Sequence, residues 1–350
     1  MTRRFPKHEL ERFVAEVMRV EGLPEADAAD VAHLMVAADM AGIDLHGIFG
    51  LTRYLPRLRA GGINKRPKIR IVRETASVAL IDGDHGMGHL VAQYAARTAI
   101  QKASETGIGW SGTRNSDHEG AASVYATMPL EHGMAGIYGA VGIGKYVPPW
   151  GGVDKLLGTN PFAIAVPTAE GPPVVMDFAT TVTSIRNARS KARLGEQLPR
   201  GWMIERDGSP LTDPTRVSEG LLLPIGGYKG YALGFVLGLL AGTLNGATMG
   251  EDAVDIEVDL HRAPGVGQFI CALDLAALGD AGSICADVDR VAWEMRRSAP
   301  LPGFDQVQVP GDGRAARLRD REENGVPIPD ALRVELSGIA KKIGVRPLSG

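Results

Sequence analysis

Apolar side chains recur every three or four positions near the start of the chain. This spacing covers residues 8–20 and 25–41, and Gly22 and Pro24 interrupt it between the two segments. A third segment of the same kind covers residues 46–61 and ends on two glycines. Positions with this period lie on one face of a helix, so the pattern predicts three helices at the N-terminal end.

Shorter apolar runs follow, separated by glycine and proline. Residues 68–74 and 77–83 resemble two paired strands, and a helical pattern over 90–105 leads into a strand-like run at 105–113. The next segments predict a helix within 119–133, strands at 133–141, 160–167 and 172–179, an apolar helix at 229–246 and charged helices from 284 onward. We expect the last helix, 330–344, to pack on the N-terminal ones. The predicted fold class is α/β, of the mixed α+β kind, with helical segments at both ends.

The composition is that of a folded protein with a substantial core. The chain has 350 residues, 44% of them hydrophobic, enough for one large or two medium-sized domains. Its 38 basic and 41 acidic residues are interspersed and give a net charge of −3, so no basic field favours nucleic acid or an anionic membrane. The apolar run at 231–247 is shorter than the roughly 20 residues of a bilayer span. We therefore expect neither partner.

Cysteine content and the first residues bear on the compartment. Cys271 and Cys285 are too few for a disulfide framework and lack metal-ligand spacing, so we expect free thiols and no metal site. The first residues enter a charged amphipathic pattern without the apolar stretch of a signal peptide. Both observations favour a cytoplasmic protein.

Residues 114–120, RNSDHEG, hold the most informative histidine. They connect the predicted strand at 105–113 to a helical segment, and ligands of open α/β sheets gather at such strand ends. Histidine titrates near neutrality, so His118 is our candidate acid/base. The alternative for any one of the eight histidines is a surface or core residue without chemistry.

Further stretches, together with residues 114–120, carry a resemblance to a known family. They are AGIDLHG (41–47), PPWGG (148–152), LGTNPFAIAVP (157–167), VMDFATT (175–181), GGYKGYALG (226–234) and VPGD (309–312). Each alone is compatible with an ordinary turn. In this order and over most of the chain they resemble the type-2 malate/L-lactate dehydrogenase family, whose members are sulfolactate dehydrogenase-like oxidoreductases.

The resemblance implies a non-Rossmann fold that binds NAD or NADP, and active sites completed across a homodimer interface. The nearest Rossmann-like motif, HGMGHL at 85–90, lacks its third glycine. Glycine loops bring backbone N–H groups to a pyrophosphate, a lysine reaches a phosphate, and Asp177 accepts hydrogen bonds from ribose. We expect cofactor contacts from Gly120, Trp150, Gly151, Gly152, Thr159, Asn160, Pro161, Asp177, Phe178, Ala179, Lys229, Gly230 and Asp312.

The resemblance also divides the chain. We expect residues 71–284 to form the NAD(P)-binding domain. Residues 1–70 and 285–350 would form a helical domain for substrate binding and dimerisation. Arg186 and Arg314 lie in basic segments that would suit a nucleotide 2′-phosphate or remain solvated, so the choice between NAD and NADP stays open.

At the substrate end the chain departs from the family pattern. His46 is expected to orient the substrate, but Leu45 and Gly50 stand where the family has a serine and the arginine that clamps the substrate carboxylate. Helical spacing directs Arg53 and Tyr54 toward the same pocket, which makes Arg53 the best substitute clamp. Lys145, between flexible glycine-containing segments, is a further candidate, and a plain surface role is the alternative for it and for Arg53.

Acidic residues flank His118 on both sides. Asp117 replaces an asparagine of the family and Glu119 a residue that is usually apolar or aromatic, which suggests a substrate less anionic than malate. The sequence thus predicts an NAD(P)H-dependent enzyme that interconverts a 2-oxo acid and a 2-hydroxy acid. One alternative is a reductase of cyclic imines such as Δ1-piperideine-2-carboxylate or Δ1-pyrroline-2-carboxylate. Another is a nucleotide-binding protein without catalysis.

Overall fold

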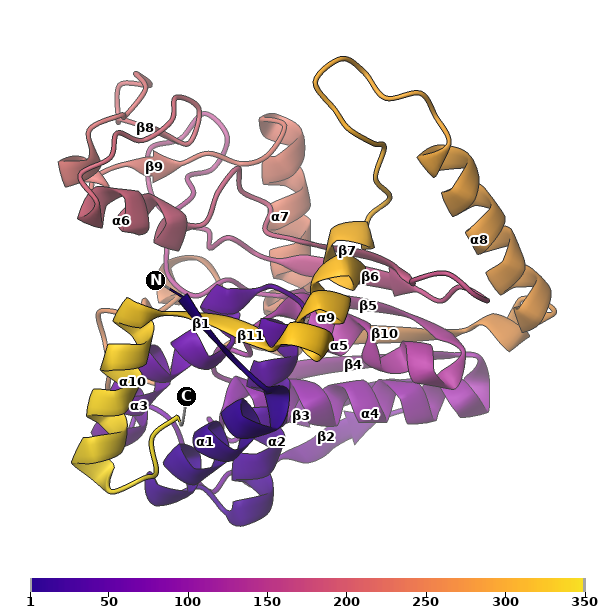
Figure 1. Cartoon of the computed structure of the whole chain (residues 1–350), viewed down its shortest axis with the longest axis horizontal. Helices are drawn as coiled ribbons and strands as arrows, with labels where there is room; N and C mark the ends of the chain where they lie inside the picture. Colours follow the sequence, from indigo (N-terminus) through magenta and orange to yellow (C-terminus); the bar gives the residue numbers. More distant parts are fainter. Residues whose placement is uncertain (1, 349–350) are drawn as a thin grey trace.

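The computed structural model describes residues 2–348, and a seven-stranded sheet forms its centre (Figure 1). The strands follow the order β2 (Arg70–Glu74), β3 (Val78–Asp82), β4 (Ile108–Arg114), β10 (Gln268–Asp274), β5 (Met134–Ala140), β6 (Phe162–Val166) and β7 (Val174–Phe178). Only β3 and β4 pair in parallel, and all the other neighbours are antiparallel. The mixed α/β class is therefore confirmed.

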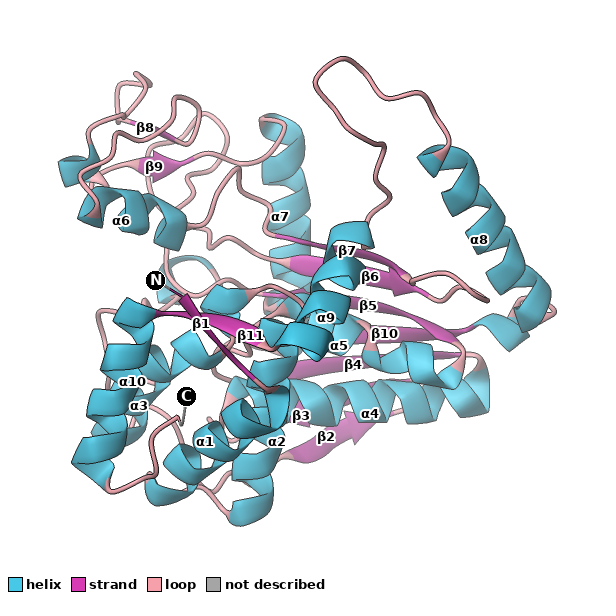
Figure 2. Cartoon of the chain, viewed as in Figure 1, coloured by secondary structure: helices cyan, strands magenta, loops and turns pink. Residues whose placement is uncertain are grey.

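Helices cover both faces of this sheet (Figure 2). The helix α4 (Gly88–Thr106) connects β3 to the parallel β4 and packs on one face through its alanines. The small residues allow close approach: a Cβ on Gly109 would lie 1.9 Å from the Ala99 carbonyl oxygen. On the same face, α5 (Ala122–Ala126) contacts β5 and β6, and the apolar α7 (Tyr228–Ala241) packs on the opposite face against β5 and β10.

The N-terminal and C-terminal segments share one apolar core. It is built by α1 (Lys7–Val20), α2 (Glu25–Met40), α3 (Leu51–Ala60) and α10 (Asp330–Ile343). In α1 the buried positions keep the predicted helical period: Leu10, Phe13, Val14, Val17 and Met18. The strand β1 (Thr2–Phe5) pairs with β11 (Val326–Pro329) and ties the two segments together. The expectation that the last helix packs on the N-terminal ones is confirmed.

Two parts project from this body (Figure 1). A lobe containing α6 (Ile185–Arg193) and the short strands β8 (Met203–Ile204) and β9 (Leu221–Leu222) has its own apolar cluster. The helix α8 (Ala281–Arg296) stands apart and precedes α9 (Asp312–Asn324). The backbone N–H groups of Ala169 and Glu170, in the turn after β6, hold α8 by donating to Asp289 at 2.8 Å.

The structure differs from the predicted elements in a few places. The segment at 46–61 begins as two 3₁₀ turns, Asp44–His46 and Ile48–Gly50, before α3. The strand β10 and the helix α6 were not predicted. The expected domain boundary at residue 285 lies within α8, and the division into two domains stays a prediction. No helix within residues 2–348 combines the length and apolarity of a membrane span.

Candidate active site

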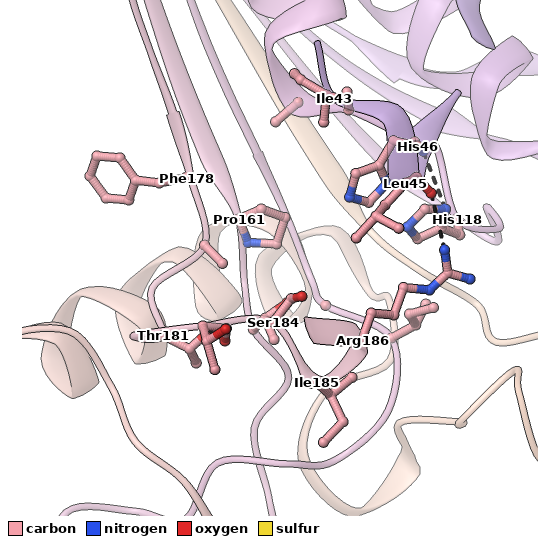
Figure 3. Close-up of a pocket in the computed structure, with 18 of the residues that line it drawn as sticks. Ile43, Leu45, His46, His118, Pro161, Phe178, Thr181, Ser184, Ile185 and Arg186 are labelled. Carbon is pink, nitrogen blue, oxygen red and sulfur yellow. Dashed lines mark hydrogen bonds between the residues drawn. The ribbon is translucent and has the colours of Figure 1, made fainter. Parts of the chain in front are cut away.

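A cavity of about 660 Å³ lies between the helical segment, the sheet and the α6 lobe (Figure 3). The expected residues that line it are His46, Arg53, His118, Glu119, Gly120, Thr159, Pro161, Asp177, Phe178 and Ala179. Other lining residues are not among the predicted site residues: the apolar Ile43, Leu45, Val141, Ile143, Val182 and Ile185, and the acidic Glu257. The cavity thus joins a cluster of histidine and arginine to a largely apolar wall.

His118 lies in the loop between β4 and α5 and is 9% exposed. The Asp117 side chain fixes this loop, because it accepts the His118 backbone N–H at 2.7 Å. The Tyr54 hydroxyl lies 2.7 Å from Nδ1 of His118, and the Gly120 N–H donates to the same nitrogen at 3.3 Å. Nη1 of Arg53 lies 3.1 Å from Nε2 and 3.2 Å from Nδ1.

This surrounding keeps the His118 ring neutral. A guanidinium only donates hydrogen bonds, so the nearby Arg53 disfavours a ring with protons on both nitrogens and favours the neutral ring, which keeps one acceptor nitrogen. Burial and the positive charge of Arg53 hold the pKa of His118 well below its ordinary value of 6.5. A neutral imidazole is the form that accepts a proton from a substrate hydroxyl.

A second imidazole lies parallel to the first. The rings of His46 and His118 stack with centroids 5.4 Å apart and planes inclined by 14°. Burial and Arg53 lower the pKa of His46 to about 3, so it is neutral as well. Its buried Nδ1 has no hydrogen-bond partner among the described residues, which leaves that atom available to a ligand.

Only one of the two acidic neighbours of His118 adds negative charge to the cavity. Asp117 forms an ion pair with Arg57 at 2.7 Å, and neither side chain is more than 1% exposed. Glu119 lines the cavity. Its carboxyl accepts from the Gln268 amide at 3.4 Å and interacts with the Tyr138 hydroxyl, and it has no ion-pair partner among residues 2–348. Burial raises the pKa of Glu119 to about 7. The expected acidic surrounding is therefore half neutralised.

Gly50 does not open space for a larger substrate. A Cβ at this position would lie 2.8 Å from Cε2 of Tyr54 and 3.3 Å from Cε of Met35. The Tyr54 ring thus occupies the place of a side chain at position 50. Tyr54 itself lies behind His118 and does not line the cavity.

The expected cofactor residues divide into two groups. The first group lines the cavity and consists of Gly120, Thr159, Pro161 and residues 177–179. Asn160 lies buried behind the cavity, where its amide accepts from the Gly142 N–H at 2.9 Å and donates to the Gly234 carbonyl oxygen at 2.7 Å. Those that do not line it are Trp150, Gly151, Gly152, Lys229, Gly230 and Asp312. Trp150 is 57% exposed, and Lys229 is exposed in the first turn of α7. Asp312 forms an ion pair with Arg296 at 2.7 Å.

Lys145 also turns away from the cavity. Its Nζ donates to the Glu251 carbonyl oxygen at 2.9 Å. A separate hollow of about 460 Å³ lies beside Asp177 and contains Arg314 and Arg317. The Ser123 N–H donates to Asp177 at 3.0 Å, and the buried Nε of Arg314 has no partner among the described residues. A polar ligand extending from the cavity into this hollow would find both an acceptor and a donor.

Arg186 was expected near a nucleotide phosphate, but the structure brings it to the histidines. It lies in the first turn of α6, and its side chain points toward Leu45 and His118 (Figure 3). Its Nη1 donates to the Leu45 carbonyl oxygen at 3.0 Å and its Nε to Glu257 at 3.2 Å. No cluster of histidine, cysteine and carboxylate side chains within residues 2–348 has the makings of a metal site.

The site combines a neutral, buried acid/base with guanidinium groups. Its cavity is large enough for a small acid and one end of a dinucleotide. These features define the site of a dehydrogenase or reductase. Comparison with known proteins agrees with this class. The malate/L-lactate dehydrogenase family model matches residues 5–337, and the chain belongs to this family of oxidoreductases. The family implies a nicotinamide cofactor.

Several relatives align over nearly their whole length. The chain is 36% identical to malate dehydrogenase of Pyrococcus horikoshii, over 99% of this chain and 97% of that protein. It is 34% identical to L-sulfolactate dehydrogenase of Methanothermobacter thermautotrophicus, over 97% of each, and 31% identical to Δ1-pyrroline-2-carboxylate reductase of Ancylobacter novellus, over 92% and 93%. The solved malate dehydrogenase from P. horikoshii superposes with a TM-score of 0.90, at 34% identity, over 99% of this chain and 97% of that one.

Proposed function

We propose that the enzyme interconverts a 2-oxo acid and its 2-hydroxy acid with NADH or NADPH. The observation that carries the proposal is the neutral His118 ring in the cavity wall, fixed by Tyr54 and Arg53. Relatives named malate and sulfolactate dehydrogenases support the substrate class.

In the oxidation of a hydroxy acid, the hydroxyl proton passes to the unprotonated ring nitrogen of His118 while two electrons leave the carbon with its hydrogen. A bound nicotinamide supplies the hydride acceptor, or the donor in the reverse direction. Tyr54, at Nδ1, holds the ring and stabilises the charge that forms on it. The free Nδ1 of His46 suits a hydrogen bond to the substrate oxygen, and Arg53 suits its carboxylate.

The residues present fit a dinucleotide. We propose that Thr159, Pro161 and the 177–179 stretch hold its nicotinamide half, and that it continues from Asp177 to Arg314. The buried Asp177 carboxylate and the unpartnered Nε of Arg314 support this path. The ratio of kcat/KM for NADPH and NADH, before and after Arg314→Gln, measures the cofactor preference. The candidates outside the cavity remain predictions: Trp150, Gly151, Gly152, Lys229, Gly230 and Asp312. The cofactor affinity of Lys229→Ala tests the proposed phosphate contact of Lys229.

The test of the main proposal is oxidation of NADH and NADPH with a panel of 2-oxo acids. We expect turnover that His118→Asn abolishes and that the exposed control His132→Asn preserves. Activity that survives His118→Asn would refute the assigned acid/base. Cofactor binding without turnover on any oxo acid or imine would support the non-catalytic alternative.

A second candidate is reduction of a cyclic imine. The observation that favours it is Glu119, a buried carboxyl in the cavity wall without a cationic partner among the described residues, which suits an N–H group of a ligand. The reductase from A. novellus gives the candidate a precedent. The enzyme would then form an amino acid from an imine. If Glu119→Phe loses this activity but still reduces 2-oxo acids, the imine reductase assignment is established.

We also propose a homodimer. Large apolar side chains are exposed along α8 and the loop after it: Val291, Trp293, Met295, Leu301 and Phe304. Exposed apolar patches of this kind usually mark protein interfaces. Light scattering of the purified protein tests the state, with Trp293→Asp expected to weaken it.

A further inference from the structure

Two guanidinium groups line the cavity together with the histidines. Arg53 comes from α3, its side chain is 5% exposed, and its buried Nε donates no hydrogen bond among the described residues. Arg186 comes from the α6 lobe and its side chain is 17% exposed. The hydrogen bonds of Arg186 use Nη1 and Nε, so its Nη2 has no acceptor within the described part of the chain. Both groups therefore keep donors for a ligand.

The protein supplies too little negative charge for this cluster. Oε1 of Glu257 lies 3.2 Å from Nε of Arg186 and 4.0 Å from Nε of Arg53. The other oxygen of Glu257 pairs with Arg189, which also lies 3.8 Å from Asp255. Asp255 thus balances Arg189, and Arg53 and Arg186 share the charge of Glu257, so a single positive charge remains on these two cavity arginines. The charge of Arg53 also lowers the pKa of Arg186, after the larger effect of burial.

The surroundings make one additional carboxylate favourable. Arg186 lies among apolar residues, with its guanidinium 5.4 Å from the centroid of the Phe49 ring and Ile185 and Leu45 beside it in the cavity wall. Charged hydrogen bonds strengthen where water is excluded. The contact with Leu45 and Phe49 also brings the guanidinium to the segment next to Gly50, which has no side chain of its own.

We propose that Arg186 is a specificity-determining residue that binds the carboxylate next to the reacting carbon, together with Arg53. The carboxylate binds the two guanidinium groups inside the cavity, where Glu257 already contacts both of them. Arg186 thus acts on the substrate and not on a nucleotide phosphate. This assignment rests on the proposed 2-oxo acid activity and names the residue that selects its acid group.

The first test compares a carboxylate with its neutral analogue. The best 2-oxo acid of the panel and its primary amide are reduced by the wild type, by Arg186→Gln and by the control Arg189→Gln. The control loses a guanidinium from the same Glu257 but does not line the cavity. For Arg186→Gln we expect kcat/KM to fall about 10-fold to 100-fold with the acid, as for a lost charged hydrogen bond. With the amide, and for the control with either compound, we expect a change of about threefold or less.

The second test does not depend on turnover. Oxamate is an isostere of a short 2-oxo acid that accepts no hydride, and its Kd for the cofactor-loaded protein reports carboxylate binding alone. We expect the Kd to rise about 10-fold or more in Arg186→Gln and to change little in Arg189→Gln. If Arg186→Gln does not fold, Arg186→Lys retains the charge without the planar fork, and we expect an intermediate loss with the acid and none with the amide.

The outcomes separate the two proposals. Equal losses with acid and amide, an unchanged preference, or a wild-type protein that does not bind oxamate would overturn the role of Arg186. Oxamate binding that depends on Arg186, in a protein that reduces no 2-oxo acid, would keep the role of Arg186 and overturn the proposed function.

Discussion

Replacing Arg57 by methionine tests whether the buried ion pair supports the loop that carries His118. The Arg57 side chain is fully buried, and it donates to Asp117 at 2.7 Å and to three carbonyl oxygens, those of Gly62 at 3.0 Å, Asp259 at 2.9 Å and Arg262 at 3.3 Å. Removing one partner of a buried pair costs about 3–5 kcal/mol, because the other charge is left in a dry site. We expect a loss of this size in the free energy of unfolding at neutral pH.

The stability loss of Arg57→Met should depend on pH in a defined direction. Burial raises the pKa of Asp117 and Arg57 opposes that rise, so the variant raises the folded-state pKa further. A carboxyl with a raised folded-state pKa contributes its full stability below its unfolded pKa, about 4, and loses it at about 1.4 kcal/mol per pH unit as the pH rises through the folded value. The deficit of Arg57→Met should therefore be smaller at about pH 5 than at about pH 8.

The assay is urea unfolding followed by circular dichroism at both pH values. The control is Arg290→Met on α8, whose exposed partners are Asp287 at 3.1 Å and Glu294 at 2.9 Å, and we expect it to cost about 0.5 kcal/mol or less. Adding Asp117→Asn to Arg57→Met should remove the pH dependence. A deficit below about 1 kcal/mol, or one that shrinks toward high pH, would refute the reasoning.

Three other variants test individual contacts. Tyr54→Phe removes the 2.7 Å bond to His118, and we expect kcat to fall about 3-fold to 10-fold while the thermal midpoint changes little; an unchanged kcat would contradict the positioning role. Gly120→Ala places a Cβ 3.0 Å from Nε2 of His89 at a φ of +91°, and urea unfolding should show a loss of about 1–3 kcal/mol. Glu119→Gln removes a carboxyl whose folded pKa is about 7, above an unfolded value near 4. The stability that this group gives the wild type is lost as the pH rises between these values. The free energy of unfolding of the variant should therefore gain up to about 3 kcal/mol relative to wild type by pH 7. A difference in unfolding free energy that does not change across this pH range would count against the prediction.

Local patterns predicted those parts of the fold that local forces decide. The helices α1, α2 and α4 and the strands β3 to β7 follow the apolar periods of their own residues. The strand β10 escaped prediction, although it occupies the centre of the sheet between β4 and β5. Its partners lie more than 100 residues earlier in the chain, and a periodicity reports which residues share a face but not which segments pair.

In the site, too, local spacing predicted some residues and tertiary packing decided the others. Helical spacing from His46 predicted that Arg53 and Tyr54 point into one pocket. In the structure Arg53 lines the cavity, whereas Tyr54 lies behind it and contacts His118. Helical spacing could not place Arg57, which neutralises Asp117, or Arg186, which adds positive charge to the cavity. Arg57 reaches Asp117 across 60 positions, and Arg186 reaches Glu257 across 71. Such contacts depend on tertiary packing, so the acidic residues around His118 suggested a more negative site than the folded chain has.

The placement of Arg53 and Arg186 couples substrate binding to the protonation of His118. Both positive charges lower the pKa of this ring in the free enzyme. A carboxylate bound between them, as we propose, would offset their charge and raise that pKa toward its ordinary value. The free enzyme then holds a neutral base, suited to accept the proton of a hydroxy acid, whereas a bound 2-oxo acid favours the imidazolium that must return it. The acid group that the arginines select therefore also adjusts the proton affinity of the residue that acts on the neighbouring carbon.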